Sequence, residues 1–252
     1  MADRLAARIG GLFIPLSLVS AAHSEAVAAP CGNPALVTID IGHTPKRGGA
    51  TSARGVPEYV FNKRLAGFLA RRLDRTPGFQ TRVLNPSGRN ISLRRRADEI
   101  AGVRTGVLLS IHHDSAQLRY FSKWTYKGRK RRYSDKFSGH SLFVSSRSAK
   151  YRASQSLGSE IGRALRGAGL TPTLHHAEPI KGENRPLLDA RLGLYDFAGL
   201  RVLRSARVPA VLIEAGMIVN RQDELVLGTE RFIGRFTGAV VSGLKRFCNV
   251  KG

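Results

Sequence analysis

The chain has 252 residues, of which 42% are hydrophobic, and it carries a formal net charge of +23. This length and hydrophobic content suffice for one well-filled domain or two small ones. Such a charge predicts attraction to polyanions and acidic surfaces. Because no nucleic-acid-binding motif accompanies the charge, we expect no specific nucleic-acid partner. Beyond the N-terminal segment, no apolar run is long enough to span a bilayer.

The N-terminal residues 1–29 have the pattern of a secretory signal peptide. Arg4 and Arg8 precede an apolar stretch over residues 9–22, and small residues follow, ending in Ala-Val-Ala-Ala at 26–29. This order of charged, apolar and small residues is typical of a cleaved signal. An uncleaved anchor is the alternative. We therefore predict an exported protein whose mature part is residues 30–252.

The two cysteines, Cys31 and Cys248, lie near the two ends of the mature chain. In an oxidising compartment they could form one disulfide that ties the termini together. Two unrelated thiols are the alternative, because a disulfide requires the Cα atoms to approach within about 7 Å. We favour the disulfide.

Strand-like and helix-like segments alternate after residue 30, which predicts an α/β fold. The expected strands are residues 35–42, 79–84, 107–112, 141–145, 200–204 and 210–214. The expected helices are residues 57–73, 91–103, 148–167 and two that Asn220 and Thr229 cap. Residues 113–139 read as a long loop and residues 171–190 as irregular. With no repeat, linker or composition break, we predict one domain with a twisted, mostly parallel sheet of about six strands, flanked by helices on both faces.

Three candidate site residues stand where predicted strands end. His43 follows the first strand, His112 ends the third, and Glu214 ends the last, whereas Glu58 follows Pro57 at the first turn of a helix. Strands of an open α/β sheet that end together place their last side chains in one crevice. Two imidazoles and a carboxylate suit a zinc ion, and a second glutamate suits a general base.

Five blocks of the sequence carry a resemblance to one family. They are VTIDIGH (37–43), PEYVFN (57–62), a segment ending in Ser-Ile-His-His-Asp (92–116), GHSLFVS (139–145) and the stretch around Glu214 (200–224). In this order they resemble the zinc-dependent N-acetylmuramoyl-L-alanine amidases, the catalytic domain of bacterial cell-separation amidases and of many phage and spore lysins. The resemblance runs from about residue 36 to 245.

The resemblance implies a role for each matched residue. It makes His43, Glu58 and His112 the ligands of one Zn²⁺ per chain and Glu214 the catalytic acid/base. Asn62, four residues after the glutamate in PEYVFN, also matches the family pattern. Asp40 could orient a ligand or could be an ordinary strand-end carboxylate, and both readings stay open.

Three further histidines lie near the candidate site. His113 should point away from His112, because side chains alternate along a strand. We expect it to support a metal ligand or to contact substrate or a loop, and not to bind the metal. His175 and His176 could approach the site, although solvated loop histidines are the favoured interpretation.

The segment 119–136 combines eight Lys/Arg residues with a single acid, Asp135, and with aromatic residues that include the only tryptophan, Trp124. The aromatic rings could stack on sugars while the cations attract anionic wall or envelope polymers. A solvated, mobile loop is the alternative, and both stay open.

The function implied by the resemblance is hydrolysis of the amide bond between N-acetylmuramic acid and L-alanine in peptidoglycan. We expect a monomer in the periplasm or cell wall of a bacterium. The alternatives are a zinc deacetylase or peptidase acting on another wall amide, and an inactive cationic protein that binds cell wall or polyanions. Residues 146–199 leave little room beyond one helix, so we expect no built-in inhibitory helix.

Overall fold

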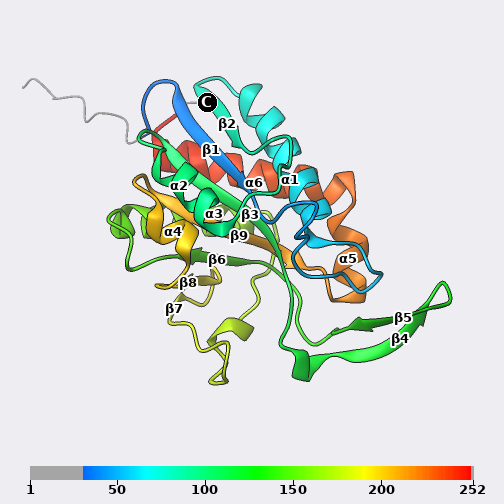
Figure 1. The fold of residues 1–252 in the computed structure, drawn as a ribbon. Coiled ribbons are helices and arrows are strands. Elements are labelled where there is room, and N and C mark those ends of the chain that lie inside the picture. The colour runs from blue at the N-terminus through cyan, green and yellow to red at the C-terminus, as the bar shows by residue number, and fades with distance from the viewer. Residues whose placement is uncertain (1–30, 251–252) are drawn as a thin grey trace, which may run out of the picture.

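The computed structural model describes residues 31–250, so the predicted signal peptide lies outside the described residues. Its main sheet has seven strands in the order β2-β1-β3-β9-β6-β8-β7 (Figure 1). The strands are β1 (Ala35–Ile41), β2 (Phe79–Leu84), β3 (Val107–Asp114), β6 (Ser141–Val144), β7 (Leu187–Asp189), β8 (Leu194–Asp196) and β9 (Ala210–Met217). Pairing is parallel from β2 to β9 and between β6 and β8, and antiparallel between β6 and β9 and between β7 and β8.

The predicted α/β class is confirmed, but two of the expected segments differ. β7 lies within residues 171–190, which were expected to be irregular, and β8 follows in residues for which no strand was predicted. These two strands raise the number in the main sheet of the described chain from about six to seven. Residues 200–204 are not a strand, because Arg201–Ser205 forms the short helix α4. Val202 and Leu203 are both buried there, and two consecutive buried side chains suit a helix face better than an alternating strand.

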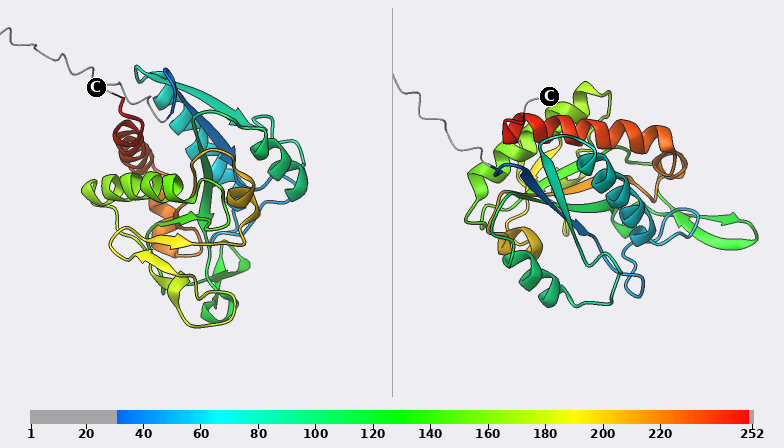
Figure 2. Two further views of the ribbon diagram at one scale, coloured as in Figure 1. Left: turned by 90° about the vertical axis from the view of Figure 1, so that its left-hand side faces the viewer. Right: turned by 90° about the horizontal axis from the view of Figure 1, so that it is seen from above.

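Helices cover both faces of the sheet (Figure 2). They are α1 (Glu58–Asp74), α2 (Leu93–Ala101), α3 (Tyr151–Gly167), α4 (Arg201–Ser205), α5 (Arg221–Leu227) and α6 (Glu230–Cys248). One hydrophobic cluster packs α1, α3 and α6 against the sheet, and the other packs α2 and α4 against the opposite face. The predicted caps are present, since Asn220 accepts from the Gln222 and Asp223 amides and Thr229 accepts from the Phe232 amide.

Side chains alternate between the two faces along the central strands β3 and β9, and so they face the two hydrophobic clusters in turn. Ile111 and Ile213 belong to the cluster under α1, α3 and α6, whereas Leu108 and Leu212 belong to the cluster under α2 and α4. Even-numbered residues up to His112 on β3 and Glu214 on β9 therefore share the α2/α4 face of the sheet.

The expected loop 113–139 contains a second, two-stranded sheet. Its strands β4 (Ser122–Tyr126) and β5 (Arg129–Tyr133) pair antiparallel and form a hairpin that projects from the body (Figure 1). Lys127 and Gly128 both have positive φ at the turn, as tight hairpin turns require. The interpretation as an unstructured loop was wrong. The strands read SKWTY and RKRRY, and four consecutive cations in β5 hide the polar–apolar alternation that usually marks a strand.

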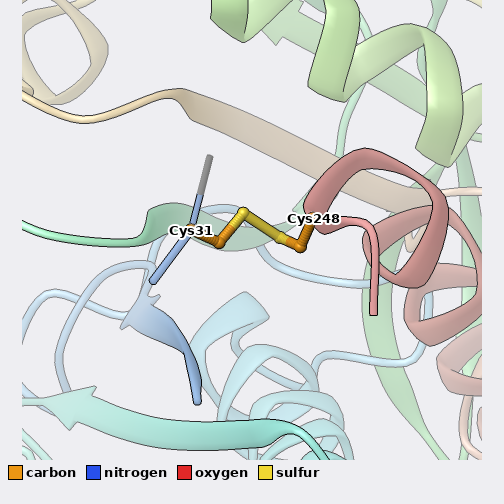
Figure 3. Close-up of a disulfide and its surroundings, with 2 residues drawn as sticks. All are labelled: Cys31 and Cys248. Atoms are coloured by element: carbon orange, nitrogen blue, oxygen red, sulfur yellow. A yellow bond between two sulfur atoms is a disulfide. The ribbon is translucent and has the colours of Figure 1, made fainter. Parts of the chain in front are cut away.

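The predicted disulfide is present between Cys31 and Cys248, whose Cα atoms are 5.3 Å apart (Figure 3). It joins the segment before β1 to the last residue of α6. Within residues 31–250, none of the helices combines the length and the apolar character needed to cross a membrane.

Candidate active site

Three of the predicted site residues converge at the carboxyl ends of β1 and β3. The Nε2 atom of His43 lies 3.0 Å from one carboxylate oxygen of Glu58, and the Nδ1 atom of His112 lies 3.0 Å from the other. The two imidazole rings meet edge to face, with their centroids 5.0 Å apart. All three donor atoms lie within 4.8 Å of one another, so they form one group that could hold a metal ion.

Two glycines make this approach possible, and sequence reasoning did not single them out. A Cβ atom at Gly42 would lie 2.5 Å from the His112 ring, and one at Gly49 would lie 2.4 Å from Glu58 Oε2. Gly49 also has a φ of +78°, which other residues rarely adopt. The spacing GHTPKRGG after the first strand was the available signal, since glycines often mark a close approach of backbone to a site.

Glu58 is held in place from several sides. Its carboxylate accepts hydrogen bonds from the side-chain amide of Asn62 at 3.0 Å and from the backbone amide of Ala50 at 3.1 Å. Burial would raise the pKa of Glu58, but hydrogen bonds and charges from His112 and His43 lower that pKa well below its usual range. Glu58 is therefore an ionised carboxylate at neutral pH, which is the form that binds a metal.

Glu214 lies directly across the β3–β9 ladder from His112. Its Oε2 atom is buried and has no hydrogen-bond partner among the described residues. Burial raises the pKa of Glu214 well above its usual range, and the charges of Asp114 and Glu58 raise it further. A carboxyl group with a raised pKa can both take and give a proton near neutral pH.

Asp40 acts on the backbone beside His43 and not on an imidazole ring. Its carboxylate accepts from Ser110 Oγ at 2.7 Å and from the guanidinium of Arg96. Arg96 in turn donates to the backbone carbonyls of Ile41 and His43. The buried Asp40–Arg96 pair thus holds the turn that carries His43, which itself has a φ of +67°.

His113 does not line the cleft. Its contacts favour support of a metal ligand over contact with substrate, because its backbone amide donates to Glu58 and its ring faces Asn62. The ring is 3% exposed, faces the α1 side of the sheet and lies 2.8 Å from the Asn62 carbonyl oxygen at its Nδ1 atom. Burial lowers the pKa of His113 to about 3, so the ring is neutral. Its position opposite to His112 follows from strand alternation.

A cleft opens beside His112 and Glu214, and the segment 176–185 forms one of its walls. His175 and His176 are not solvated loop histidines, because both are largely buried and face Asp114. Phe137 and Phe143 pack against the two rings, which explains why they are withdrawn from solvent. In the described part of the chain, no hydrogen bond or ion pair joins residues 171–190 to the His43–Glu58–His112 group.

Comparison with protein families matches residues 37–246 to the N-acetylmuramoyl-L-alanine amidases. The chain belongs to this family. The match covers most of the chain and includes His43, Glu58, His112 and Glu214.

A curated relative and several solved structures resemble this amidase-family chain. The probable N-acetylmuramoyl-L-alanine amidase AmiB of Haemophilus influenzae is 26% identical over 232 residues, which are 85% of this chain and 52% of that protein. The chain thus spans about half the length of this relative.

Solved structures of the same family share the fold. The catalytic domain of CwlV from Bacillus (Paenibacillus) polymyxa var. colistinus has a TM-score of 0.64 at 22% identity, over 86% of this chain and 99% of that one. Ami1 from Mycobacterium smegmatis has a TM-score of 0.65 at 19% identity, over 86% and 97%.

The hairpin is fastened to the body of this amidase-family domain by its aromatic face. The indole Nε1 of Trp124 donates to the carbonyl of Ala53 at 3.0 Å. The guanidinium of Arg54 lies 5.5 Å from the Trp124 ring centroid, and that of Arg221 lies 3.8 Å from the Tyr133 ring centroid. Cation–π contacts of this kind favour an ordered hairpin over a mobile loop.

The other face of the hairpin is cationic. Cross-strand pairing places Lys123 and Arg132 together with Lys130 on that face, and all three are exposed. They line a trough together with residues 50–52 and Ser115 of the body. Because Ser115 also lines the cleft beside Glu214, the trough and the cleft adjoin.

Proposed function

We propose that this chain is an exported zinc-dependent amidase that hydrolyses the bond between N-acetylmuramic acid and L-alanine in peptidoglycan. The observation that carries the proposal is the convergence of His43, Glu58 and His112, with Glu214 across the ladder from His112, in a chain of this family. We assign the three converging residues to the metal and Glu214 to acid/base catalysis.

The donor set suits zinc. Two imidazole nitrogens and one carboxylate are the ligands that catalytic zinc sites commonly use. Gly42 and Gly49 lack the Cβ atoms that would collide with His112 and Glu58, and so they form a glycine cradle that lets the three side chains lie close together. Asn62 and the Ala50 amide orient the Glu58 carboxylate. When bound, zinc would supply Lewis acidity for polarising the scissile carbonyl and for activating water.

Glu214 would move the protons. Its Oε2 atom, which lacks a partner among the described residues, would accept a proton from the attacking water. The same carboxyl group would then give a proton to the nitrogen of the leaving L-alanine, so that the peptide departs as a neutral amine. His112 and Glu214 line the cleft together with Asp114 and Arg185, and this supports our assignment of the reaction to that cleft.

The hairpin would bind the anionic polymers that bring the enzyme to its substrate. Its cationic face adjoins the cleft, so an anionic wall or envelope polymer held along Lys123, Lys130 and Arg132 would leave neighbouring peptidoglycan near Glu214. Trp124 then acts by fastening the hairpin to the body, because its indole N–H is taken by Ala53. We expect the binding to weaken with salt, since the attraction is electrostatic.

Export is supported by the predicted signal over residues 1–29 and by the disulfide. Structural disulfides persist in oxidising compartments and are rare in the cytosol. The Cys31–Cys248 bond is therefore consistent with a periplasmic or cell-wall location.

The decisive experiment is product analysis of purified peptidoglycan digested with the zinc-loaded protein. An amidase releases intact stem peptides with a new L-alanine amine. A deacetylase would release acetate instead, and a peptidase would expose an amine inside the stem. A binding protein would release nothing while it co-sediments with the sacculus.

A further inference from the structure

A second group of donor atoms lies beyond the amidase site. Asp114 ends β3, two residues after His112, while His175 and His176 lie in the short 3-10 helix His175–Ala177. The Nε2 atom of His176 lies 2.8 Å from Asp114 Oδ2, and the Nε2 atom of His175 lies 3.8 Å from the same oxygen. All three donor atoms lie within 4.8 Å of one another.

This spacing matches the needs of a metal ion. Ligands bound tetrahedrally at about 2.0–2.1 Å lie about 3.3 Å from one another, between the two distances seen here. The arrangement also resembles the first group of this chain, in which imidazole nitrogens lie 3.0 Å from the Glu58 oxygens.

Each imidazole is oriented by a partner on its other nitrogen. The Nδ1 atom of His176 lies 2.8 Å from Glu183, whose second oxygen accepts from Gln117 at 2.7 Å. The Nδ1 atom of His175 lies 2.9 Å from the hydroxyl of Thr173. A carboxylate or hydroxyl behind a histidine, with Nε2 directed inward, is the usual support of a metal-bound imidazole.

Protonation of the histidines would explain the contacts of His176 but not those of His175. A protonated His176 could bridge Asp114 and Glu183 by itself, since each of its nitrogens faces a carboxylate. The His175 side chain is 1% exposed, and its Nε2 atom has no hydrogen-bond partner among the described residues. At 3.8 Å from Asp114 this nitrogen is too far for a hydrogen bond. A cation between the three side chains would engage it.

We propose that Asp114, His175 and His176 bind a second divalent transition-metal cation of the zinc class. Imidazole and carboxylate donors favour such an ion over calcium or magnesium. The ion would fasten the 3-10 helix to the end of β3 and so hold the cleft wall formed by residues 176–185. This site does not depend on the amidase proposal, because it uses none of the four residues assigned there.

The test is a count of zinc ions in the mature chain, residues 30–252. The protein is stripped with a chelator, reloaded with zinc, desalted and analysed for metal content. We expect two equivalents in the wild type, one in the His43→Ala/His112→Ala variant and one in the His175→Gln/His176→Gln variant. His140→Gln is the matched control, because it removes a buried histidine outside both groups, and it should keep two.

Two readouts separate the outcomes. One equivalent in the wild type, unchanged in His175→Gln/His176→Gln, would overturn the second site alone. Retention of two equivalents in His43→Ala/His112→Ala would instead contradict the assignment of these two histidines as ligands of the catalytic zinc. If the histidine variants misfold, hydrogen exchange of the wild type decides: slower exchange over residues 174–183 on adding the second equivalent of zinc is expected, and no change would overturn the proposal.

Discussion

Glu214 and His112 face each other across the parallel ladder of β3 and β9, and both side chains leave the sheet on the α2/α4 face. This relationship joins a candidate metal ligand to a candidate acid/base through two adjacent strands, at the last pair before the register of the ladder shifts. The central position of these strands makes the spacing between the two groups rigid, which is what proton transfer requires.

Replacing Glu214 with glutamine should abolish catalysis without emptying the metal site. The amide keeps the shape of the side chain but takes no proton, so we expect kcat/KM to fall by about 10²–10⁴-fold. Release of stem peptides and zinc content are measured on the same preparation. Glu230→Gln, at the exposed start of α6, is the control. Full activity in Glu214→Gln would contradict the assigned role.

Removing the amide of Asn62 should loosen the metal site. Asn62 donates to Glu58 and to the carbonyl of Gly42, and so links the two segments that carry the ligands. We expect Asn62→Ala to weaken zinc binding by about 10–100-fold, as loss of an orienting partner commonly does. Competition with a chromophoric chelator measures it. Asn90→Ala, an exposed asparagine bonded to Thr44, should bind zinc as the wild type does.

The disulfide should stabilise the fold. The double variant Cys31→Ser/Cys248→Ser should lose about 2–5 kcal/mol of unfolding free energy, because the bond closes most of the chain into one loop. Denaturant unfolding measures the loss. A reductant should lower the midpoint of the wild type and leave that of the double variant unchanged, and a wild-type midpoint insensitive to reduction would argue against the bond.

Neutralising the cationic face of the hairpin should weaken binding to anionic wall material. In Lys123→Gln/Lys130→Gln/Arg132→Gln, co-sedimentation with isolated cell wall should fall and its salt dependence should flatten. Arg94→Gln/Arg152→Gln/Arg166→Gln removes the same charge from exposed positions on α2 and α3. Equal losses in both variants would mean that only net charge matters.

His140 should make the fold sensitive to acid. Burial lowers its pKa from 6.5 to about 4 in the folded chain. Between these values the unfolded chain binds a proton that the folded chain does not, so stability falls as the pH drops, by about 3 kcal/mol from this residue. His140→Gln should reduce the fall in unfolding free energy between pH 7 and pH 4, measured with urea. An equal fall in both proteins would exclude this origin.

Much of the site could be predicted because strand ends are local features. The runs 35–42, 107–112 and 210–214 are apolar and end in His43, His112 and Glu214, and parallel strands bring such ends together. Alternation further placed His112 and His113 on opposite faces. The family blocks then attached roles to these positions.

Other features depend on contacts between distant segments, which local pattern does not encode. The hairpin was missed because β5 has four consecutive cations in place of an alternating pattern. Its order comes from contacts with Ala53, Arg54 and Arg221. The burial of His175 and His176 likewise depends on Asp114 at the end of β3 and on Phe137 and Phe143.

By itself, the sequence determined the α/β class, the family and the four residues of the candidate active site. The tertiary structure decided what surrounds them: the glycine cradle, the wall of the cleft, and the cationic trough beside it. The physical reason is the distance along the chain over which each feature is determined. Hydrophobic period and strand ends are set within a few neighbouring residues, whereas the pairing of a buried polar group is set by whichever distant segment the fold brings into contact with it.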